Sequence, residues 1–303
     1  ADALSAKIAD GKMFGRGTTD MKSGLMAGVF AMIHLKENNV PLHGTLRLMA
    51  TVGEEYGQFG ARQLAEAGYA KDLDTLIVGE PSGVVKQAVA TPQIQQMLQI
   101  NQDSANKLMA ANQTTEQHFI ELAHKGSLTY TVSAQGVAAH SSMPEIGKNA
   151  IDSLLTFYQK QQAYFATITD KKNPVLGATV PVVTLIQGGE QINTVPASAS
   201  ISVKIRTIPE VPNTKLAADI QQLIDELNAN GEQLSLDIHS NLYPVHTADD
   251  APVVKAAKEI GETDLQQVLP LIGVTGGTVA SSFAAVNPDI DVVVFGPANI
   301  TVH

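Results

Sequence analysis

The sequence contains no cysteine among its 303 residues. Disulfide bonds are therefore excluded, and a zinc ion cannot be held by thiolates. Any metal site in this chain has to be built from carboxylate and imidazole groups. Such a donor set is more typical of catalytic sites than of structural ones.

Long apolar runs and an excess of positive charge are also missing. No apolar stretch reaches the ~18 residues that a membrane-spanning helix needs, and no signal-peptide pattern opens the sequence. The formal net charge is −10, whereas binding to nucleic-acid phosphates requires a basic surface. We therefore expect no nucleic acid and no membrane among the partners, and the composition suits a cytoplasmic enzyme.

The length and the apolar pattern predict two domains. The first begins with an alternation of strands and helices. Strands are predicted at residues 12–14, 45–51 and 75–78, and helices at residues 22–36 and 59–67. This order is typical of an α/β fold, in which ligands collect at the carboxyl ends of the strands.

The second domain is predicted as an insertion into the first. Residues 126–242 follow the order strand, helix, strand, strand, helix, strand, which is the ferredoxin-like pattern of an α+β domain. Residues 1–125 and 243–303 then form one α/β domain with a mixed sheet. Within it, residues 91–120 are rich in Gln and Asn and predict one or two exposed amphipathic helices.

Two adjacent acids, Glu54 and Glu55, follow one predicted strand and precede a helix. Neighbouring side chains point in different directions, so one carboxylate can bind a metal while the other accepts a proton from the metal-bound water. For an isolated pair of this kind, a solvated acidic turn is the more common explanation.

Three further residues lie at comparable positions. Asp20 precedes a helix, where an acid also serves as an N-cap; Glu80 follows a strand; and His303 follows the last predicted strand. In a parallel-type sheet the ends of these strands would meet at one edge. Converging carboxylates repel each other unless cations neutralise them, so the combination predicts a metal centre.

The motifs around these residues occur in a recognisable order. They are GRGTTDMKSG (15–24), TVGEEY (51–56), GEPS (79–82), GVAAHSSMP (136–144), GGEQINTVP (188–196), GGT (276–278) and GPANITVH (296–303). Over almost the whole chain they resemble the co-catalytic zinc deacylases and peptidases. This family includes succinyl-diaminopimelate desuccinylase, acetylornithine deacetylase, aminoacylase and glutamate carboxypeptidases. The resemblance implies a metallopeptidase-like catalytic domain, with the inserted domain acting as lid and dimerisation domain.

The resemblance also implies the metal ligands. Asp20 would bridge two Zn²⁺ ions, which such sites hold ~3.5–4 Å apart, and the peptide bond after Asp20 would be cis. Glu55 and His303 would complete one metal site, and Glu80 would bind the other metal. Co²⁺ or Mn²⁺ are alternatives to zinc.

Further roles follow from the same motifs. Glu54 would be the general base and later the proton donor to the leaving amine. His140 would stabilise the oxyanion, in the neighbouring subunit's site of a homodimer, and Arg206 would grip a substrate carboxylate with its bidentate guanidinium. Taken alone, these two could equally be a loop histidine and a surface arginine. Additional candidates for substrate binding are Asn193, Gly277 and Thr278.

The sequence departs from the family in several places. Members carry a His-x-Asp pair upstream of the Asp20 motif, and we expect that pair in a segment preceding Ala1. Without it, one metal site has three ligands and the other has two, so two Zn²⁺ per subunit are expected only in a complete chain. Val279 stands where many relatives have Asp, and residues 91–120 exceed the connection expected there.

These observations predict the metal-dependent hydrolysis of an amide bond in an N-acyl amino acid. Lys125 and Arg206 would suit a substrate that carries a carboxylate. Two alternatives remain open: a dipeptidase or aminopeptidase of the same family, and a catalytically impaired binding or scaffold protein.

Overall fold

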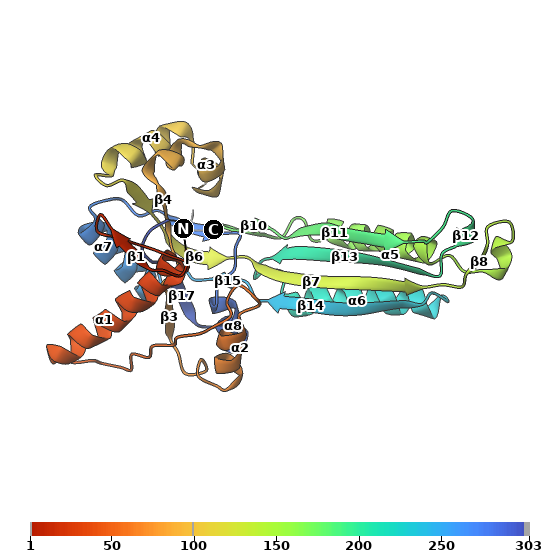
Figure 1. Cartoon of the computed structure of the whole chain (residues 1–303), viewed down its shortest axis with the longest axis horizontal. Coiled ribbons are helices and arrows are strands. Elements are labelled where there is room, and N and C mark those ends of the chain that lie inside the picture. Colours follow the sequence, from red (N-terminus) through yellow and green to blue (C-terminus); the bar gives the residue numbers. More distant parts are fainter. Residues whose placement is uncertain (1, 99, 300–303) are drawn as a thin grey trace. The chain divides into compact units, whose positions relative to one another are not determined.

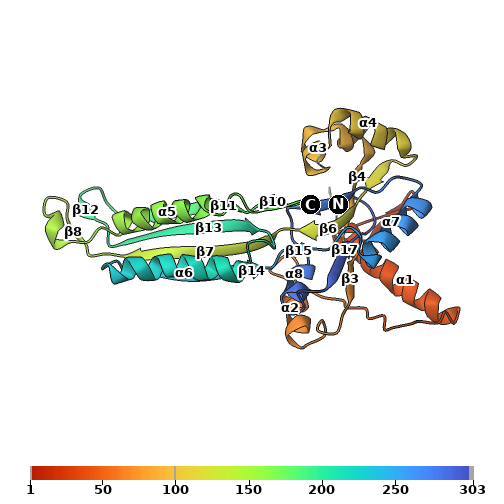
Figure 2. The ribbon, with the colours of Figure 1, turned by 180° about the vertical axis from the view of Figure 1, so that it is seen from behind.

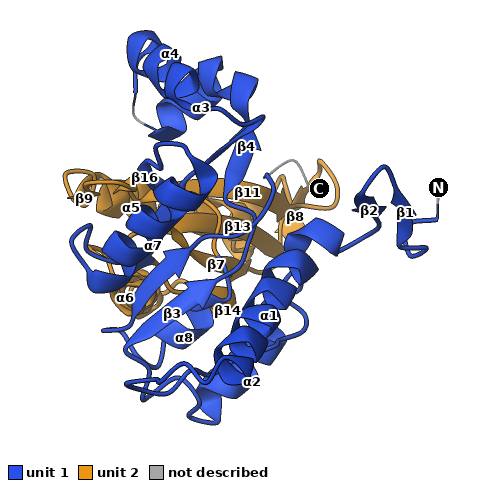
Figure 3. Ribbon diagram, turned by 90° about the vertical axis from the view of Figure 1, so that its left-hand side faces the viewer, with its two compact units in different colours: residues 1–124, 245–274, 278–303 blue, residues 125–244, 275–277 orange. Residues whose placement is uncertain are grey.

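The computed structural model of the protein describes residues 2–98 and 100–299, which fold into two compact units (Figure 3). The first unit consists of Ala1–His124, Val245–Val274 and Thr278–His303. The second consists of Lys125–Pro244 and Thr275–Gly277. The predicted fold class, α/β with a mixed sheet, is confirmed.

A mixed sheet of short strands forms the centre of the first unit. In spatial order the strands are β15 (Val245–His246), β6 (Ile120–His124), β17 (Asp291–Val294) and β3 (Thr75–Val78), and β16 (Leu271–Val274) also pairs with β6. β17 runs parallel to β3 and antiparallel to β6. Val294 pairs with Val78 of β3 on one side and with Glu121 of β6 on the other. β17 therefore lies between β3 and β6.

Helices of the first unit pack on this sheet through small and β-branched side chains. They include α2 (Phe59–Glu66), α7 (Pro252–Leu265) and α8 (Ala280–Ala284), whereas α1 (Gly24–Glu37) has no buried residue. Ala61 and Ala65 are one helical turn apart on α2 and share a buried cluster with Phe283 of α8. In residues 2–98 and 100–299, no helix has both the length and the apolar character required to cross a membrane.

The Gln/Asn-rich segment forms two helices and a strand. Helices α3 (Pro92–Leu98) and α4 (Gln102–Ala111) precede β5 (Glu116–His118), which pairs with β4 (Gly83–Val85). The segment is not simply exposed, because Ala105 and Phe119 are buried in one apolar cluster with Ile272 of β16. It therefore adds an apolar cluster of its own to the first unit.

The second unit is an antiparallel sheet covered on one face by two helices. Its strands lie in the order β11 (Val180–Gly188), β13 (Ser198–Thr207), β7 (Gly126–Gln135) and β14 (Leu234–Leu242). Helices α5 (Ala150–Ala166) and α6 (Asn213–Ala229) lie on the same face (Figures 1 and 2). Alternate residues of β7 are buried beneath them: Leu128, Tyr130, Val132 and Ala134.

One predicted strand is wrong. Residues 45–51 form no strand, and Leu46 and Leu48 remain 48% and 42% exposed. Residues with strand propensity form a strand only where a neighbouring backbone completes the hydrogen-bonded ladder, and no described residue supplies one here. Residues 12–14 form β2 (Lys12–Phe14), but it pairs only with β1 (Lys7–Ala9), outside the central sheet. Of the strands expected to converge, β3 and β17 are the ones that lie side by side.

Candidate functional site

Asp20 lies in a tight turn before α1. In this turn, η1 (Thr18–Ser23), the backbone angles of Asp20 and Met21 are not helical, and the peptide bond between them is cis, as the resemblance implies. Gly17 takes a φ of 78°, a conformation that glycine adopts without steric cost. The hydroxyl of Thr18 donates to the carbonyl of Gly15 at 2.8 Å and helps to hold the turn.

Glu80 follows β3 and lies beside Asp20. The approach depends on two glycines, because a Cβ atom on Gly24 would stand only 1.9 Å from the carbonyl oxygen of Gly79. Any side chain at Gly24 would therefore push the start of α1 away from the end of β3. With the two backbones in contact, the Glu80 carboxyl hydrogen-bonds to Asp20.

The electrostatics of Glu80 indicate a concentration of negative charge. Burial raises its pKa, and the hydrogen bond and charge of Asp20 raise it further. The charges of Glu54 and Glu121 act in the same direction. A divalent cation would remove this repulsion, and carboxylate oxygens are suitable ligands for Zn²⁺ and for harder ions. The residues around Glu80 therefore fit a cation.

The described residues do not form a complete coordination set. Among residues 2–98 and 100–299, no group of three or more His, Asp or Glu side chains is arranged to hold a metal ion. Glu55 is exposed, and its charge is not among those that act on Glu80. His303 lies outside the described residues. The structure thus brings Asp20, Glu80 and Glu54 together.

Glu54 is half-buried in the turn that leads into α2. Gln58, which precedes α2, is 2% exposed and donates to Glu54 Oε1 at 3.4 Å and to the carbonyl of Thr278 at 2.7 Å. The hydroxyl of Ser282 donates to Gln58 Oε1 at 3.1 Å. Gln58 therefore holds the Glu54 turn against the start of α8. The sequence analysis missed this residue, and no sequence pattern in a single chain marks it.

Glu121 is the second residue that sequence reasoning missed. It lies in the middle of β6, where every residue is buried, and burial raises its pKa to about 8. A charged residue inside the apolar run Phe119–Ala123 was the available signal.

Two predicted residues of the second unit are adjacent to each other. His140 ends β8 (Ala139–His140), which pairs with β12 (Thr194–Val195), and the backbone N–H of Ser141 donates to the carbonyl of Asn193 at 2.9 Å. The backbone N–H of Ser142 donates to His140 Nδ1 at 3.2 Å. Nδ1 is therefore an acceptor, and the neutral imidazole of His140 carries its proton on Nε2.

Arg206 and Lys125 bring two positive charges together in the same unit. Lys125 is 5% exposed, and its Nζ donates to the carbonyl of Ala178 at 2.6 Å. Burial lowers the pKa of Lys125, and the charge of Arg206 lowers it further. Arg206 is half-buried on β13, between Val180 of β11 and Ser127 of β7. Two cations this close together are suited to binding a carboxylate.

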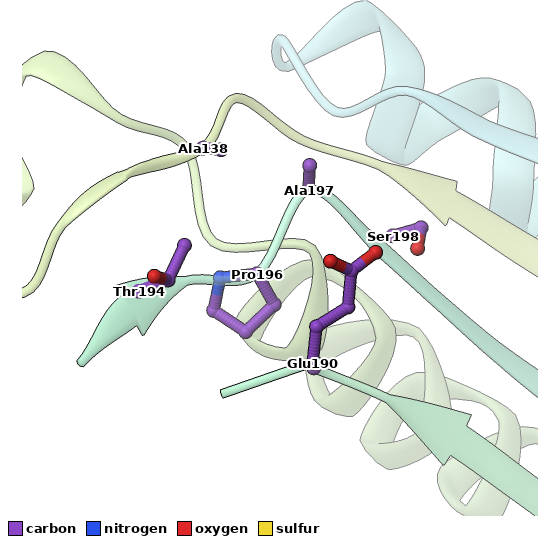
Figure 4. Close-up of a pocket in the computed structure, with 7 residues that line it drawn as sticks. Ala138, Glu190, Thr194, Pro196, Ala197 and Ser198 are labelled. Atoms are coloured by element: carbon purple, nitrogen blue, oxygen red, sulfur yellow. The ribbon is translucent and has the colours of Figure 1, made fainter. Parts of the chain in front are cut away.

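The remaining candidates fall into different units. Gly277 belongs to the second unit and Thr278 to the first, where Thr278 is buried and its carbonyl accepts the Gln58 hydrogen bond. A pocket in the second unit lies between residue 138 and residues 189–198, with the Glu190 carboxylate extending toward Ser198 (Figure 4). Its volume of about 50 Å³ is far below the ~300–1,000 Å³ of small-molecule sites, so it does not bind the substrate by itself.

The matches to known proteins extend over nearly the whole chain. A family model described as peptidase family M20/M25/M40 matches residues 2–303. A probable succinyl-diaminopimelate desuccinylase from Staphylococcus aureus is 37% identical over 315 residues, which cover 95% of this chain and 68% of that protein. Its counterpart from Staphylococcus epidermidis is 33% identical over 312 residues, with coverage of 95% and 68%.

Solved structures share the fold at lower identity. Aminopeptidase PepT from Bacillus cereus has a TM-score of 0.61 and 22% identity over 96% of this chain and 67% of its own. The M20 family metallo-carboxypeptidase Sso-CP2 from Sulfolobus solfataricus has a TM-score of 0.61 and 17% identity, with coverage of 97% and 71%. The resemblance found in the motifs is confirmed by these matches, and the chain belongs to peptidase family M20/M25/M40.

Proposed function

We propose that the protein hydrolyses the amide bond of an N-acyl amino acid whose acyl group carries a carboxylate. The observation that carries this proposal is the half-buried Asp20–Glu80 carboxyl pair, with Glu54 close enough for its charge to act on Glu80. Such a pair is unfavourable without a cation, and a general base beside it has no use in a protein that only binds.

Asp20 and Glu80 are the residues that would hold a divalent cation, with Glu55 and His303 as further ligands. A bound Zn²⁺ would polarise the amide carbonyl and lower the pKa of a water molecule to ~7. Co²⁺ and Mn²⁺ take the same oxygen and nitrogen donors. Two ions per subunit are proposed for the complete protein.

Glu54 moves the proton in this reaction. Its carboxylate accepts a proton from the attacking water, the oxygen forms a bond to the amide carbon, and the C–N bond then breaks. Glu54 returns the proton to the leaving nitrogen, so the products are a carboxylate and a free amine. Gln58 keeps the Glu54 carboxylate in one orientation through its contact to Oε1.

His140 and Asn193 are proposed to act on the substrate from the second unit. Because the neutral His140 ring carries its proton on Nε2, that N–H can donate to the oxygen that becomes negative in the transition state. The adjacent Asn193, together with Gly277 and Thr278, would contact the amino-acid part of the substrate.

Lys125 and Arg206 are proposed to set the substrate class. Two neighbouring cations favour a carboxylate, and a guanidinium binds it with two parallel hydrogen bonds. Two relatives are described as probable succinyl-diaminopimelate desuccinylases. This name specifies a succinyl group, which is an acyl group that carries a carboxylate. We therefore place a succinyl-type substrate ahead of an acetylated amino acid or a peptide.

The protein is further proposed to form a homodimer through β11. This strand is at the open edge of its sheet, and Val182, Leu185 and Ile186 are 50%, 60% and 61% exposed. An apolar edge strand pairs readily with another strand. When two copies of β11 pair across a twofold axis, the unpaired backbone groups of both strands gain hydrogen-bond partners.

A substrate panel tests the proposed function. The purified protein, with and without added Zn²⁺, Co²⁺ or Mn²⁺, is incubated with N-succinyl-diaminopimelate, N-acetylornithine and a set of dipeptides, and amine release is measured. We expect release from the succinyl substrate that stops when a chelator removes the metal. Release only from peptides would assign a peptidase instead. A protein that binds Zn²⁺ but hydrolyses none of them would support the scaffold alternative.

A further inference from the structure

Glu121 is a carboxylate in the interior of the first unit, on the central strand β6. It is 7% exposed, and its neighbours Ile120 and Leu122 are 0% and 2% exposed. Within residues 2–98 and 100–299, no hydrogen bond or opposite charge acts on its pKa, which burial alone raises. The group is therefore buried without a partner of opposite charge among the described residues.

Such a position is unfavourable for a carboxylate. Moving a charged or strongly polar group out of water is costly unless a hydrogen bond or an opposite charge compensates. An apolar residue would fit an apolar strand better, as Ile120 and Leu122 do. The presence of Glu121 therefore calls for an interaction that residues 2–98 and 100–299 do not provide.

The sheet brings Glu121 toward the acidic residues of the site. Val294 pairs with Glu121 on β6 and with Val78 on β3, and Glu80 follows Val78 by two residues. One strand thus separates the two glutamates. They are close enough that the charge of Glu121 acts on the Glu80 carboxyl.

We propose that Glu121 lies behind the cation site, and that its negative charge strengthens the binding of a divalent cation between Asp20 and Glu80 without ligating the ion. This inference rests on the proposed function, since it requires that the protein binds such a cation. Glu121 acts through the ion and its ligands rather than on the substrate, so it is a positioning residue. The cation supplies an opposite charge near Glu121, for which burial is the only influence on the pKa among the described residues.

The proposal predicts opposite effects on metal-free and metal-loaded protein. Glu121→Gln keeps the shape of the side chain and removes its charge. The metal-free variant should melt at a higher temperature than the metal-free wild type, because a neutral amide costs less to bury. The affinity of the variant for Zn²⁺ should fall roughly ten- to hundredfold, as it does when residues that orient metal ligands are replaced. Glu121→Asp keeps the charge and should recover part of the affinity.

The experiment is a titration of chelator-treated protein with Zn²⁺ in competition with a chromogenic chelator, alongside thermal melts with and without Zn²⁺. Wild type, Glu121→Gln, Glu121→Asp and a control, Glu232→Gln in the second unit, are compared. The control removes a carboxylate that has Ser153 and Lys148 as partners, so it should lose thermal stability and keep the affinity for Zn²⁺.

Three results would separate the possibilities. Unchanged Zn²⁺ affinity in Glu121→Gln would overturn this inference and leave the proposed function intact. A Glu121→Gln protein that is less stable than the wild type without metal, or that does not fold, would also overturn it, because the carboxylate would then serve a structural contact. A wild type that binds no divalent cation would overturn the proposed function itself.

Discussion

The side-chain amide of Gln58 donates to the backbone carbonyl of Thr278 at 2.7 Å, although 220 positions separate the two residues in the sequence. The same amide also contacts Oε1 of Glu54. The turn that carries the proposed base is thus fixed to the segment that begins α8. Its geometry depends on a residue that takes no part in the chemistry.

Replacing Gln58 by Ala should therefore slow turnover without weakening substrate binding. Glu54 would lose the donor that orients it, and small misplacements of a catalytic group cost on the order of a hundredfold in rate. We expect kcat to fall ten- to hundredfold with KM nearly unchanged. The matched control is Gln63→Ala on the exposed side of α2. A large rise in KM would argue instead that Gln58 shapes the substrate site.

Glu54→Gln should remove nearly all activity while leaving metal binding largely intact. The amide keeps the volume and the contact to Gln58 but cannot accept a proton from water, and general-base catalysis contributes roughly 10²–10⁴-fold. Turnover and bound Zn²⁺ are measured on the same preparation. A variant that turns over at near wild-type rates would show that another group is the base.

Arg206→Gln should raise KM for a succinylated substrate roughly ten- to hundredfold, because a charged hydrogen bond to the carboxylate is lost. The effect should be much smaller on a substrate whose acyl group is acetyl. Lys204→Gln, an exposed position on the same strand, is the control. Equal losses for both substrates would show that Arg206 contacts the amino-acid part and not the acyl group.

The stability of the protein should depend on pH through Glu232. The hydroxyl of Ser153 lowers the pKa of Glu232 most; burial opposes this, and Lys148, 3.2 Å away, lowers it further. Because the pKa is lower in the folded state, the stabilisation is present above the ordinary value of 4.5 and is lost as the pH falls through the folded pKa. Glu232→Gln should cost about 1 kcal/mol at pH 7 and nothing in strong acid.

Ser153→Ala provides the check on that interpretation. It removes the main donor, so its loss of stability at pH 7 should overlap with that of Glu232→Gln. In chemical unfolding at several pH values, the double variant should be less destabilised than the sum of the two single variants. Strictly additive losses would show that the two residues do not interact.

Leu185→Lys should weaken the proposed dimer. A charge on the exposed edge of β11 is a common barrier to strand pairing. Light scattering after size-exclusion chromatography should show wild-type dimers and a shift to monomers in the variant. Ile192→Lys, which changes a fully exposed loop residue, should leave the mass unchanged. A wild type that is monomeric at all concentrations would refute the dimer.

Parts of the fold followed from sequence because local pattern and tertiary context agree there. Residues 75–78 are a short apolar run before Gly79, and they form β3 with those bounds. Residues 45–51 have similar propensity and form no strand. The difference lies in the partner: β3 has β17 as a neighbour, and no described strand lies beside residues 45–51. Propensity alone does not contain that information.

The candidate site shows the same limit. Motif order was enough to select Asp20, Glu54 and Glu80, which the structure brings near one another. Gln58 and Glu121 were not predictable, since their positions depend on contacts with residues far away in sequence. Sequence periodicity describes faces of helices and strands, but it does not report which faces meet.

The contact between Gly24 and Gly79 has a consequence for how such a chain can change over time. The two residues bear no functional group, yet the spacing of the Asp20 and Glu80 side chains depends on their main chains touching. Random variation at either position would separate the carboxyl groups as surely as replacing one of them. Positions where the main chain touches itself near a reactive centre therefore limit evolutionary drift as strictly as the reactive residues do.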